Sequence, residues 1–221
     1  MSLIKAMGFD GLGINPRQFQ LGDVLCAAEQ LPATIAANAV SVTGQLLANS
    51  LIQSTETANA TYTLDTAANI ILALQNIANI ANIQNGTSWR LRHVNNAAFT
   101  VTYASTANTG TSVALPTINA SSVKEFLITV INGTPAQTFA CTTTNASAVL
   151  GGLTQSQCAQ LSPGMIVTNA VAGLQGDTIL SVNASAGTVT MSGNANATNA
   201  VAVAVSFSPV VALQGLGQGL L

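Results

Sequence analysis

The stretch LDTAANIILALQNI, Leu64–Ile77, decides the first element of the fold because its apolar residues recur at helical spacing. This spacing predicts an amphipathic helix with one apolar stripe. Asp65 is the expected N-cap, since its carboxylate can accept from backbone N–H groups two and three residues further on. Asn85-Gly86 is the expected stop, because both residues tolerate the left-handed conformation that ends helices. The stripe consists of Ile70, Leu74, Ile77 and Ala81.

Three strand patterns follow the helix and end at Ile131. Residues 87–94 alternate apolar and basic side chains, so they predict a strand with one face toward the core. Residues 98–103 alternate again after the turn sequence Asn95-Asn96-Ala97, and the two runs together predict an antiparallel hairpin covered by the helix. Residues 123–131 are the longest and most apolar run, expected at the centre of a sheet. The expected core face of the hairpin is Trp89, Leu91, Phe99, Val101 and Tyr103, with His93 beside it.

Residues 1–60 are predicted to be an N-terminal arm and docking segment. Residues 8–19 alternate glycine with single large apolar side chains, which is typical of an extended segment anchored at intervals. Two interpretations are open: an arm laid across a neighbouring subunit, or a strand on the chain's own domain. Residues 33–42 predict a strand, and residues 45–53 predict a second strand or a helical turn. The expected anchors of the arm are Phe9, Leu12, Ile14 and Phe19.

The fold class expected is mainly β, with antiparallel sandwich or barrel domains and one amphipathic helix in a central domain, residues 61–135. Residues 136–221 form short strands at regular spacing with Gly, Asn and Ser turns, which predicts a small C-terminal β-sandwich or barrel. The tail from residue 214 to residue 221 is rich in glycine and leucine, so it is interpreted as either a second contact arm or a flexible end.

Charge is unusually scarce in this chain. Charged residues make up 5% of the sequence, against about 25% in an average domain. A net charge of −2 gives copies little mutual repulsion, so we expect a protein that functions assembled, with its surface covered by neighbours. Five basic residues are too few for a nucleic-acid partner. No apolar run approaches about 18 residues, and no signal-peptide pattern opens the chain, which favours no membrane partner and assembly in a cytoplasm.

The sequence contains no recognisable catalytic motif. His93 is the only histidine, and a triad with Asp65 or Glu125 would need a shaped nucleophile turn that is not visible. A lone histidine on an apolar strand face is more typical of a hydrogen-bonded core residue. The acidic residues form no paired-carboxylate motif and the cysteines match no zinc spacing, so we expect no enzyme, no metal and no cofactor.

The cysteines leave two alternatives open. Cys141 and Cys158 bracket a Thr- and Gly-rich segment and could close a surface loop as a disulfide worth about 3 kcal/mol. The alternative is that both, together with Cys26, are reduced and mostly buried thiols.

One cluster of charge stands out on strands expected to be neighbours. Glu125 is expected to pair with Arg90 or Arg92, as opposite charges do across strands. Such a pair is either a solvated surface contact of little energetic value or a contact that sets the register between subunits, where scarce charges would matter most. The predicted subunit-interface residues are Arg90, Arg92, Lys124 and Glu125.

About a third of the chain resembles structural proteins of tailed phages. The resemblance lies in a T-A-A-N-I helix (residues 66–70), the motif G-T-S-x-R-x-R-x-x-N (residues 86–95) and an E-F-L strand (residues 125–127) after a serine-rich turn. Residues 161–165 and 188–192 are similar to small β modules of phage and bacterial surface proteins. The resemblance implies a non-enzymatic capsid decoration (cement) protein on the virion surface, assembled as a homo-oligomer, commonly a trimer, and bound to the major capsid protein.

Two other classes are alternatives to the decoration protein. A phage tail, spike or receptor-binding fibre component would need exposed aromatic residues or a polar pocket for a glycan, and the only candidates for stacking are Trp89, Tyr62 and Tyr103, which are expected in the core. A bacterial surface-layer or adhesin module is less consistent with the lack of an export pattern.

Overall fold

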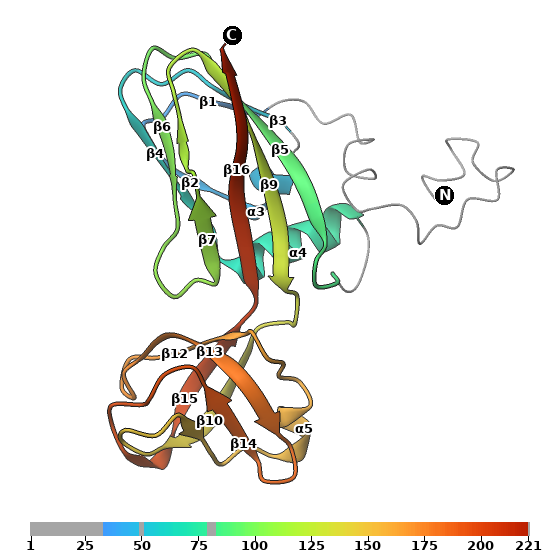
Figure 1. Cartoon of the computed structure of the whole chain (residues 1–221), viewed down its shortest axis with the longest axis vertical. Coiled ribbons are helices and arrows are strands. Elements are labelled where there is room, and N and C mark those ends of the chain that lie inside the picture. The colour runs from blue at the N-terminus through green and yellow to red at the C-terminus, as the bar shows by residue number, and fades with distance from the viewer. Residues whose placement is uncertain (1–32, 49–50, 79–82, 221) are drawn as a thin grey trace, which may run out of the picture.

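The structure is a computed structural model that describes residues 33–48, 51–78 and 83–220. These residues form two lobes stacked along the long axis of the molecule (Figure 1). The larger lobe is a two-layer β-sandwich with helices at one end, and the smaller lobe is a β-barrel. The predicted mainly-β class is therefore confirmed, with three helices described where the sequence predicted one.

The sandwich is built from two sheets. The six-stranded sheet has the order β1-β3-β5-β9-β16-β7, and the four-stranded sheet has the order β2-β4-β6-β8. The strands of the first are β1 (Ala33–Ile35), β3 (Leu51–Ser54), β5 (Ser88–Asn95), β9 (Ser122–Asn132), β16 (Val210–Leu220) and β7 (Thr111–Ala114). The strands of the second are β2 (Ala39–Val42), β4 (Ala60–Leu64), β6 (Val101–Ala104) and β8 (Thr117–Ile118).

From β1 to β6 the chain alternates between the two sheets. Odd-numbered strands lie in the first sheet and even-numbered strands in the second, so successive strands of one sheet run the same way. The pairs β1–β3, β3–β5, β2–β4 and β4–β6 are all parallel. The expected antiparallel pairing is found for β5–β9, β9–β16 and β6–β8 in this lobe, but not for these four pairs. The predicted hairpin of residues 87–94 and 98–103 is also wrong, because β5 and β6 lie in different sheets.

Asparagine side chains hold the corners where the chain crosses from one sheet to the other. The amide of the buried Asn95 donates to the carbonyl oxygens of Phe99 (2.8 Å) and Asn119 (2.9 Å), and its Oδ1 accepts from the N–H of Ala97 (3.0 Å). Asn38, at the crossing from β1 to β2, accepts from the backbone of the crossing from β3 to β4 through the N–H of Thr57 (3.2 Å). The turn predicted at residues 95–97 therefore exists, but it bends the chain into the other sheet.

Two helices close the opposite end of the sandwich. They are α3 (Gly44–Ala48) and α4 (Ala67–Ala78), the predicted helix. Gly44 lets them approach closely, since a Cβ there would lie 2.6 Å from the carbonyl oxygen of Asn69. The expected cap residue is wrong by one position. Thr66 Oγ1 accepts from the N–H of Asn69 (3.2 Å), which is N-cap geometry, whereas Asp65 accepts from the Asn69 side-chain amide (2.7 Å).

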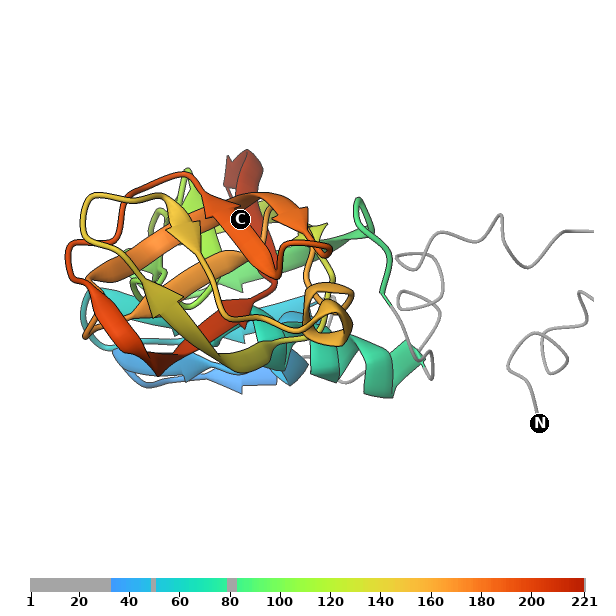
Figure 2. The ribbon, with the colours of Figure 1, turned by 90° about the horizontal axis from the view of Figure 1, so that it is seen from below.

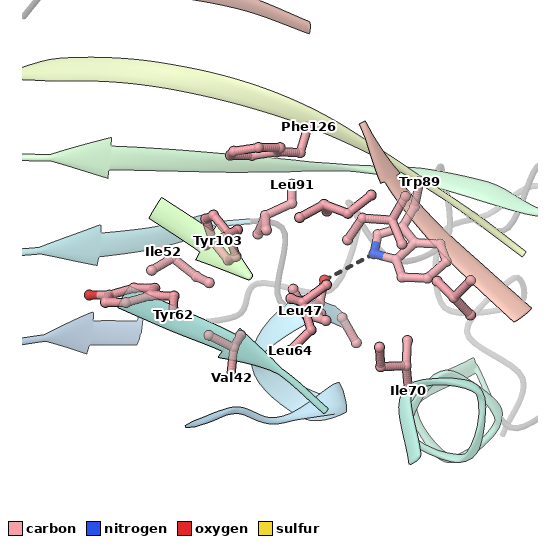
Figure 3. Packing of buried hydrophobic residues seen from close by; sticks show 14 of the residues in the cluster. Val42, Leu47, Ile52, Tyr62, Leu64, Ile70, Trp89, Leu91, Tyr103 and Phe126 are labelled. Atoms are coloured by element: carbon pink, nitrogen blue, oxygen red, sulfur yellow. Dashed lines mark hydrogen bonds between the residues drawn. The ribbon is translucent and has the colours of Figure 1, made fainter. Parts of the chain in front are cut away.

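The sandwich core lies between the two sheets and the helices (Figure 3). Ile70 and Leu74 of the predicted stripe are buried, Ile77 packs against the core, and Ala81 lies outside the described residues. Trp89 is buried and donates from Nε1 to the carbonyl oxygen of Leu47 (2.9 Å), which ties the first sheet to α3. Of the predicted core face, Leu91, Val101 and Tyr103 are also buried, while Phe99 is exposed at a corner.

The smaller lobe is a closed antiparallel barrel. Its strand order is β10-β15-β12-β13-β14-β11, and a bridge between Thr142 and Gly151 joins the two end strands through backbone hydrogen bonds of 2.9 and 3.0 Å. Figure 2, seen from the barrel end, shows these strands around a common centre. The elements are β10 (Gln137–Thr143), β11 (Val149–Leu150), α5 (Gln155–Cys158), β12 (Ile166–Asn169), β13 (Leu174–Asn183), β14 (Thr188–Met191) and β15 (Asn199–Ser208).

The barrel is an insertion between two neighbouring strands of the sandwich. The chain leaves at the end of β9, and β16 returns to pair with β9, with Val210 opposite Asn132. The buried Asn132 side chain holds the junction by donating to Ser162 Oγ (2.9 Å) and the Pro163 carbonyl oxygen (2.8 Å). The expected domain limits are therefore corrected: residues 33–48 and 51–60 belong to the sandwich. Residues 214–220 of the glycine–leucine tail form the end of β16 in the same lobe.

Candidate assembly surface

The outer face of the six-stranded sheet is not covered by any other described strand or helix. Side chains on this face alternate with the buried ones along β5 and β9. Its centre combines half-buried apolar side chains with charged ones. Ile131 is 51% exposed, and the half-buried apolar residues of this face are Leu51, Val94, Val123 and Leu127.

Three of the four predicted interface residues lie on this face. Arg90 Nη1 and Glu125 Oε2 are 3.1 Å apart and form the predicted cross-strand pair, with side chains 68% and 45% exposed. A pair this exposed stabilises the fold by at most about 1 kcal/mol. Arg92 lies opposite Glu125 in the ladder, is exposed, and has no ion-pair partner among the described residues. Its guanidinium is thus available for a contact outside the chain.

Lys124 does not belong to this surface, which corrects the prediction. It shares the buried face of β9 with Phe126 and is 7% exposed. Its Nζ donates to the carbonyl oxygens of Leu115 (2.7 Å) and Thr117 (2.8 Å) and lies 5.6 Å from the centre of the Phe126 ring. Its charge therefore holds residues 115–117, at the start of β8, against the first sheet and is not available for a subunit contact.

The arm anchors Phe9, Leu12, Ile14 and Phe19 lie outside the described residues, as does Cys26. Cys141 and Cys158 are both buried and free, so the structure has no disulfide between them. Burial raises the pKa of the Cys141 thiol to about 11, with a further contribution from Cys158, which keeps the thiol protonated and unreactive.

A buried polar cluster lies behind the sheet face, inside the sandwich. Tyr103 Oη and His93 Nδ1 are 2.8 Å apart, and His93 Nε2 and Ser54 Oγ are 2.9 Å apart. Ser54 in turn donates to Asn95 Oδ1 (3.3 Å). Burial lowers the pKa of His93 to about 3, so the imidazole is neutral and carries one N–H. Because Ser54 donates to Asn95, it accepts from Nε2–H, which leaves Nδ1 to accept from Tyr103 Oη.

The cluster also contains a buried carboxyl group. Glu56 is 4% exposed, and one of its oxygens accepts from Tyr62 Oη. Its other oxygen, Oε2, is buried without a hydrogen-bond partner among the described residues. Burial raises the pKa of Tyr62, with Glu56 adding to the effect, and burial also raises the pKa of Tyr103. Both phenols therefore act as neutral hydrogen-bond donors.

The cluster does not have the geometry of a hydrolytic site. A catalytic serine donates its proton to the histidine, whereas Ser54 accepts from His93 and donates to Asn95. No carboxylate in the described part of the chain bonds to His93, and both Ser54 and His93 are 0% exposed. The prediction that His93 is a hydrogen-bonded core residue is confirmed, and so is the burial of Trp89 and both tyrosines.

The barrel surface is almost free of charge. Between residues 137 and 208, Asp177 is the single charged side chain. Several large apolar side chains are exposed there, among them Val171 (66%), Leu180 (58%) and Val201 (84%). Single exposed apolar side chains are common on protein surfaces, and they indicate a contact surface where they lie together.

Reasoning from the sequence missed two features of the sandwich. The first is the set of asparagine side chains at the crossings between the sheets; the repeated sequence Ala-Asn-Ala at residues 37–39 and 58–60 could have indicated it. The second is the open edge of β16 beyond Gln214, where β7 no longer pairs with it; it follows from the tertiary arrangement alone.

None of the described helices is long and apolar enough to cross a membrane. In the same residue ranges, no three His, Cys, Asp or Glu side chains gather where they could hold a metal ion. Comparison of the chain with known protein families, curated proteins and solved structures finds no match.

Proposed function

We propose that this protein is a non-enzymatic capsid decoration subunit of a tailed phage, bound to the outside of the assembled shell. The observation that carries the proposal is the nearly uncharged surface with exposed apolar side chains on both lobes. Such a surface favours contact with neighbouring proteins over a solitary existence in water. The resemblance of residues 64–130 to phage structural proteins points to the same class.

The proposed partners are the major capsid protein and further copies of the chain, in a trimer. Each copy would bridge neighbouring capsid subunits, so that several weak apolar contacts add up through avidity. In the trimer the outer sheet face would supply the subunit contact, with Arg92 and the Arg90–Glu125 pair setting its register. Because the attachment to the shell is mainly apolar, it should resist salt.

The burial of Trp89, Tyr62 and Tyr103 argues against the receptor-binding alternative, because these rings cannot stack on a glycan. A tail or spike component would also be present in few copies. The first test is therefore quantitative mass spectrometry of purified particles. Hundreds of copies per particle would support decoration of the shell, a handful would assign the chain to a tail or spike, and absence from particles would overturn both.

A second test addresses the contacts. Particles are washed in about 1 M NaCl, where the screening length is about 3 Å; release of the protein would contradict a mainly apolar attachment. Arg92→Glu is then compared with Arg92→Lys, which retains the charge. We expect the first to weaken trimer formation while its thermal unfolding is unchanged, since Arg92 is exposed. An intact trimer in Arg92→Glu would reduce these charges to a solvated face.

A further inference from the structure

The C-terminal half of β16 has an open edge in the six-stranded sheet. β7 pairs with β16 from Val211 to Gln214 and then ends, whereas β9 pairs with β16 as far as Leu220. Figure 1 shows β16 running beyond the end of β7 toward the C-terminus. Along this part of the strand, backbone groups on the side away from β9 have no ladder partner among the described residues.

This edge lacks most of the features by which proteins protect open strands. Charged side chains and proline commonly block pairing at an edge, and the segment Gly215-Leu216-Gly217-Gln218-Gly219-Leu220 contains neither. Every residue from Leu216 to Leu220 is exposed, with Leu220 at 89%. A bulge between Gly215 and Gln218 is the one protective feature of this segment, and it limits the length that can pair.

The glycines make close approach of a second backbone possible. A Cβ added at Gly217 or at Gly219 would meet nothing within 4 Å, so both sites are open on the outside. The added strand would meet no side chain at these two positions. Strand addition to such an edge draws its affinity from main-chain hydrogen bonds and its specificity from alternate side chains.

We propose that this edge pairs with the same edge of a second copy, antiparallel about a twofold axis at Gln218. In this register Leu216 lies opposite the partner's Leu220 and Gly217 opposite the partner's Gly219, so each exposed leucine is covered by a leucine. No charge opposes another. A twofold contact also uses both edges at once and therefore closes without forming a fibre. The inference rests on the strand edge and does not depend on the proposed function.

The size of the contact sets its strength. The paired stretch from Leu216 to Leu220 spans about 17 Å and buries far less than the roughly 1,200 Å² of a stable interface. The free protein should therefore dimerise weakly through this edge, and the contact should strengthen when copies are held side by side, because their effective concentration rises. On a shell it would link copies that belong to neighbouring positions.

Cysteine crosslinking tests the register with a matched control. Gln218→Cys and Gln214→Cys change the same residue type on the same strand, in a background where Cys26 is replaced by Ser. Residue 218 lies opposite its own copy at the proposed axis, although the native Gln218 side chain donates to Ser122 Oγ of its own chain (2.9 Å). Residue 214 lies four positions away, where β7 covers the edge. Under mild oxidation we expect covalent dimer to form at least about ten-fold faster for Gln218→Cys. Equal rates, or a faster reaction at 214, would overturn the pairing.

Charge at the edge supplies the second measurement. Leu220→Lys, added to Gln218→Cys, should slow crosslinking at least about five-fold because each lysine then replaces the leucine that faces the partner's Leu216. The control is Leu180→Lys, which changes another exposed leucine, on the barrel (58% exposed). It should leave the crosslinking rate unchanged. If both lysines slow the reaction equally, or neither does, the contact is not at this edge.

The N-terminal segment is the competing occupant of the edge. Gln218→Cys with the native Cys26 retained distinguishes it, because a neighbour's segment lying along the edge would give a disulfide between residues 218 and 26. Peptide mapping that finds mainly this 218–26 link would overturn pairing between two β16 edges. A 218–218 link as the main product supports it.

Discussion

Among the described residues, the sandwich buries seven that are polar or charged and the barrel buries one, Thr143, although both lobes are β structures with closed apolar cores. Part of the difference follows from the path of the chain. In the barrel, successive pairings are antiparallel and the sheet closes on itself, so backbone groups satisfy one another. In the sandwich the chain crosses between sheets, and Asn95, Ser122 and Lys124 donate to backbone carbonyl oxygens at these crossings. The remaining buried polar residues of the sandwich form the hydrogen-bonded side-chain cluster around His93 and the junction at Asn132. The seven are Ser54, Glu56, His93, Asn95, Ser122, Lys124 and Asn132.

The largest expected effect comes from removing one buried ring in each lobe. Phe126→Ala and Phe207→Ala each delete a fully buried side chain, which typically costs about 3–5 kcal/mol. The chain's one tryptophan and both tyrosines lie in the sandwich, so fluorescence reports this lobe alone, while circular dichroism reports both.

We expect Phe126→Ala to lower the denaturant midpoint measured by fluorescence, and Phe207→Ala to leave that midpoint in place while shifting part of the dichroism transition. If both variants shifted both signals together, the two lobes would unfold as one unit and the comparison would fail.

The second effect is pH dependence that is confined to the sandwich. The pKa of His93 is about 3 in the folded chain and about 6.5 when unfolded. Between these values only the unfolded chain binds the proton, so the contribution of His93 to the free energy of unfolding is fully present above pH 6.5 and falls as the pH drops. The loss is about 1.4 kcal/mol per pH unit, which amounts to roughly 3 kcal/mol by pH 4.

Urea unfolding followed by fluorescence from pH 7 to pH 4 measures this loss, and His93→Gln is the control because glutamine does not titrate. We expect His93→Gln to be less stable than the wild type at pH 7. As the pH falls, its free energy of unfolding should decrease by about 1.4 kcal/mol less per pH unit than that of the wild type. The barrel contains no histidine, so its transition should move little. Parallel pH profiles for the wild type and His93→Gln would exclude His93 as the cause.

The third effect tests whether the crossings depend on their asparagines. Asn95→Ala leaves two carbonyl oxygens and one N–H of the corner without their partner, which should cost about 3 kcal/mol because the site is buried. Asn96→Ala changes the adjacent, exposed residue and should cost no more than about 0.5 kcal/mol. Thermal unfolding of the two variants decides the matter. Similar midpoints would show that Asn95 does not hold the corner.

The sequence predicts individual strands better than their partners, and the physical reason is visible at β5 and β6. Alternation along a strand reports which face is buried, so the inward positions of Trp89, Leu91 and His93 follow correctly from it. Alternation does not report which strand lies beside it. The turn that begins at Asn95 has the same sequence whether the chain folds back on β5 or crosses to the second sheet.

Reasoning from single strands also explains why Lys124 was predicted on the surface together with Arg90, Arg92 and Glu125. Cross-strand pairing of Arg90 with Glu125 followed from adjacent strands, and alternation alone would have placed Lys124 inside, on the face of Phe126 and Ile128. Lysine's preference for the surface overrode that signal. The backbone carbonyl oxygens that make burial of its charge possible, those of residues 115 and 117, are set by the tertiary fold and leave no mark on the sequence.

The smallest expected effect compares equivalent caps in the two lobes. Thr66 accepts from the N–H of Asn69 at the start of α4, and Thr154 forms a capping box with Gln157 at the start of α5. Thr66→Ala and Thr154→Ala should each cost about 1 kcal/mol, in the fluorescence transition for the first and in the dichroism transition alone for the second. Replacing each threonine with serine, which retains the hydroxyl, should restore stability. A loss in fluorescence stability for Thr154→Ala would mean that α5 supports the sandwich across the junction at Asn132.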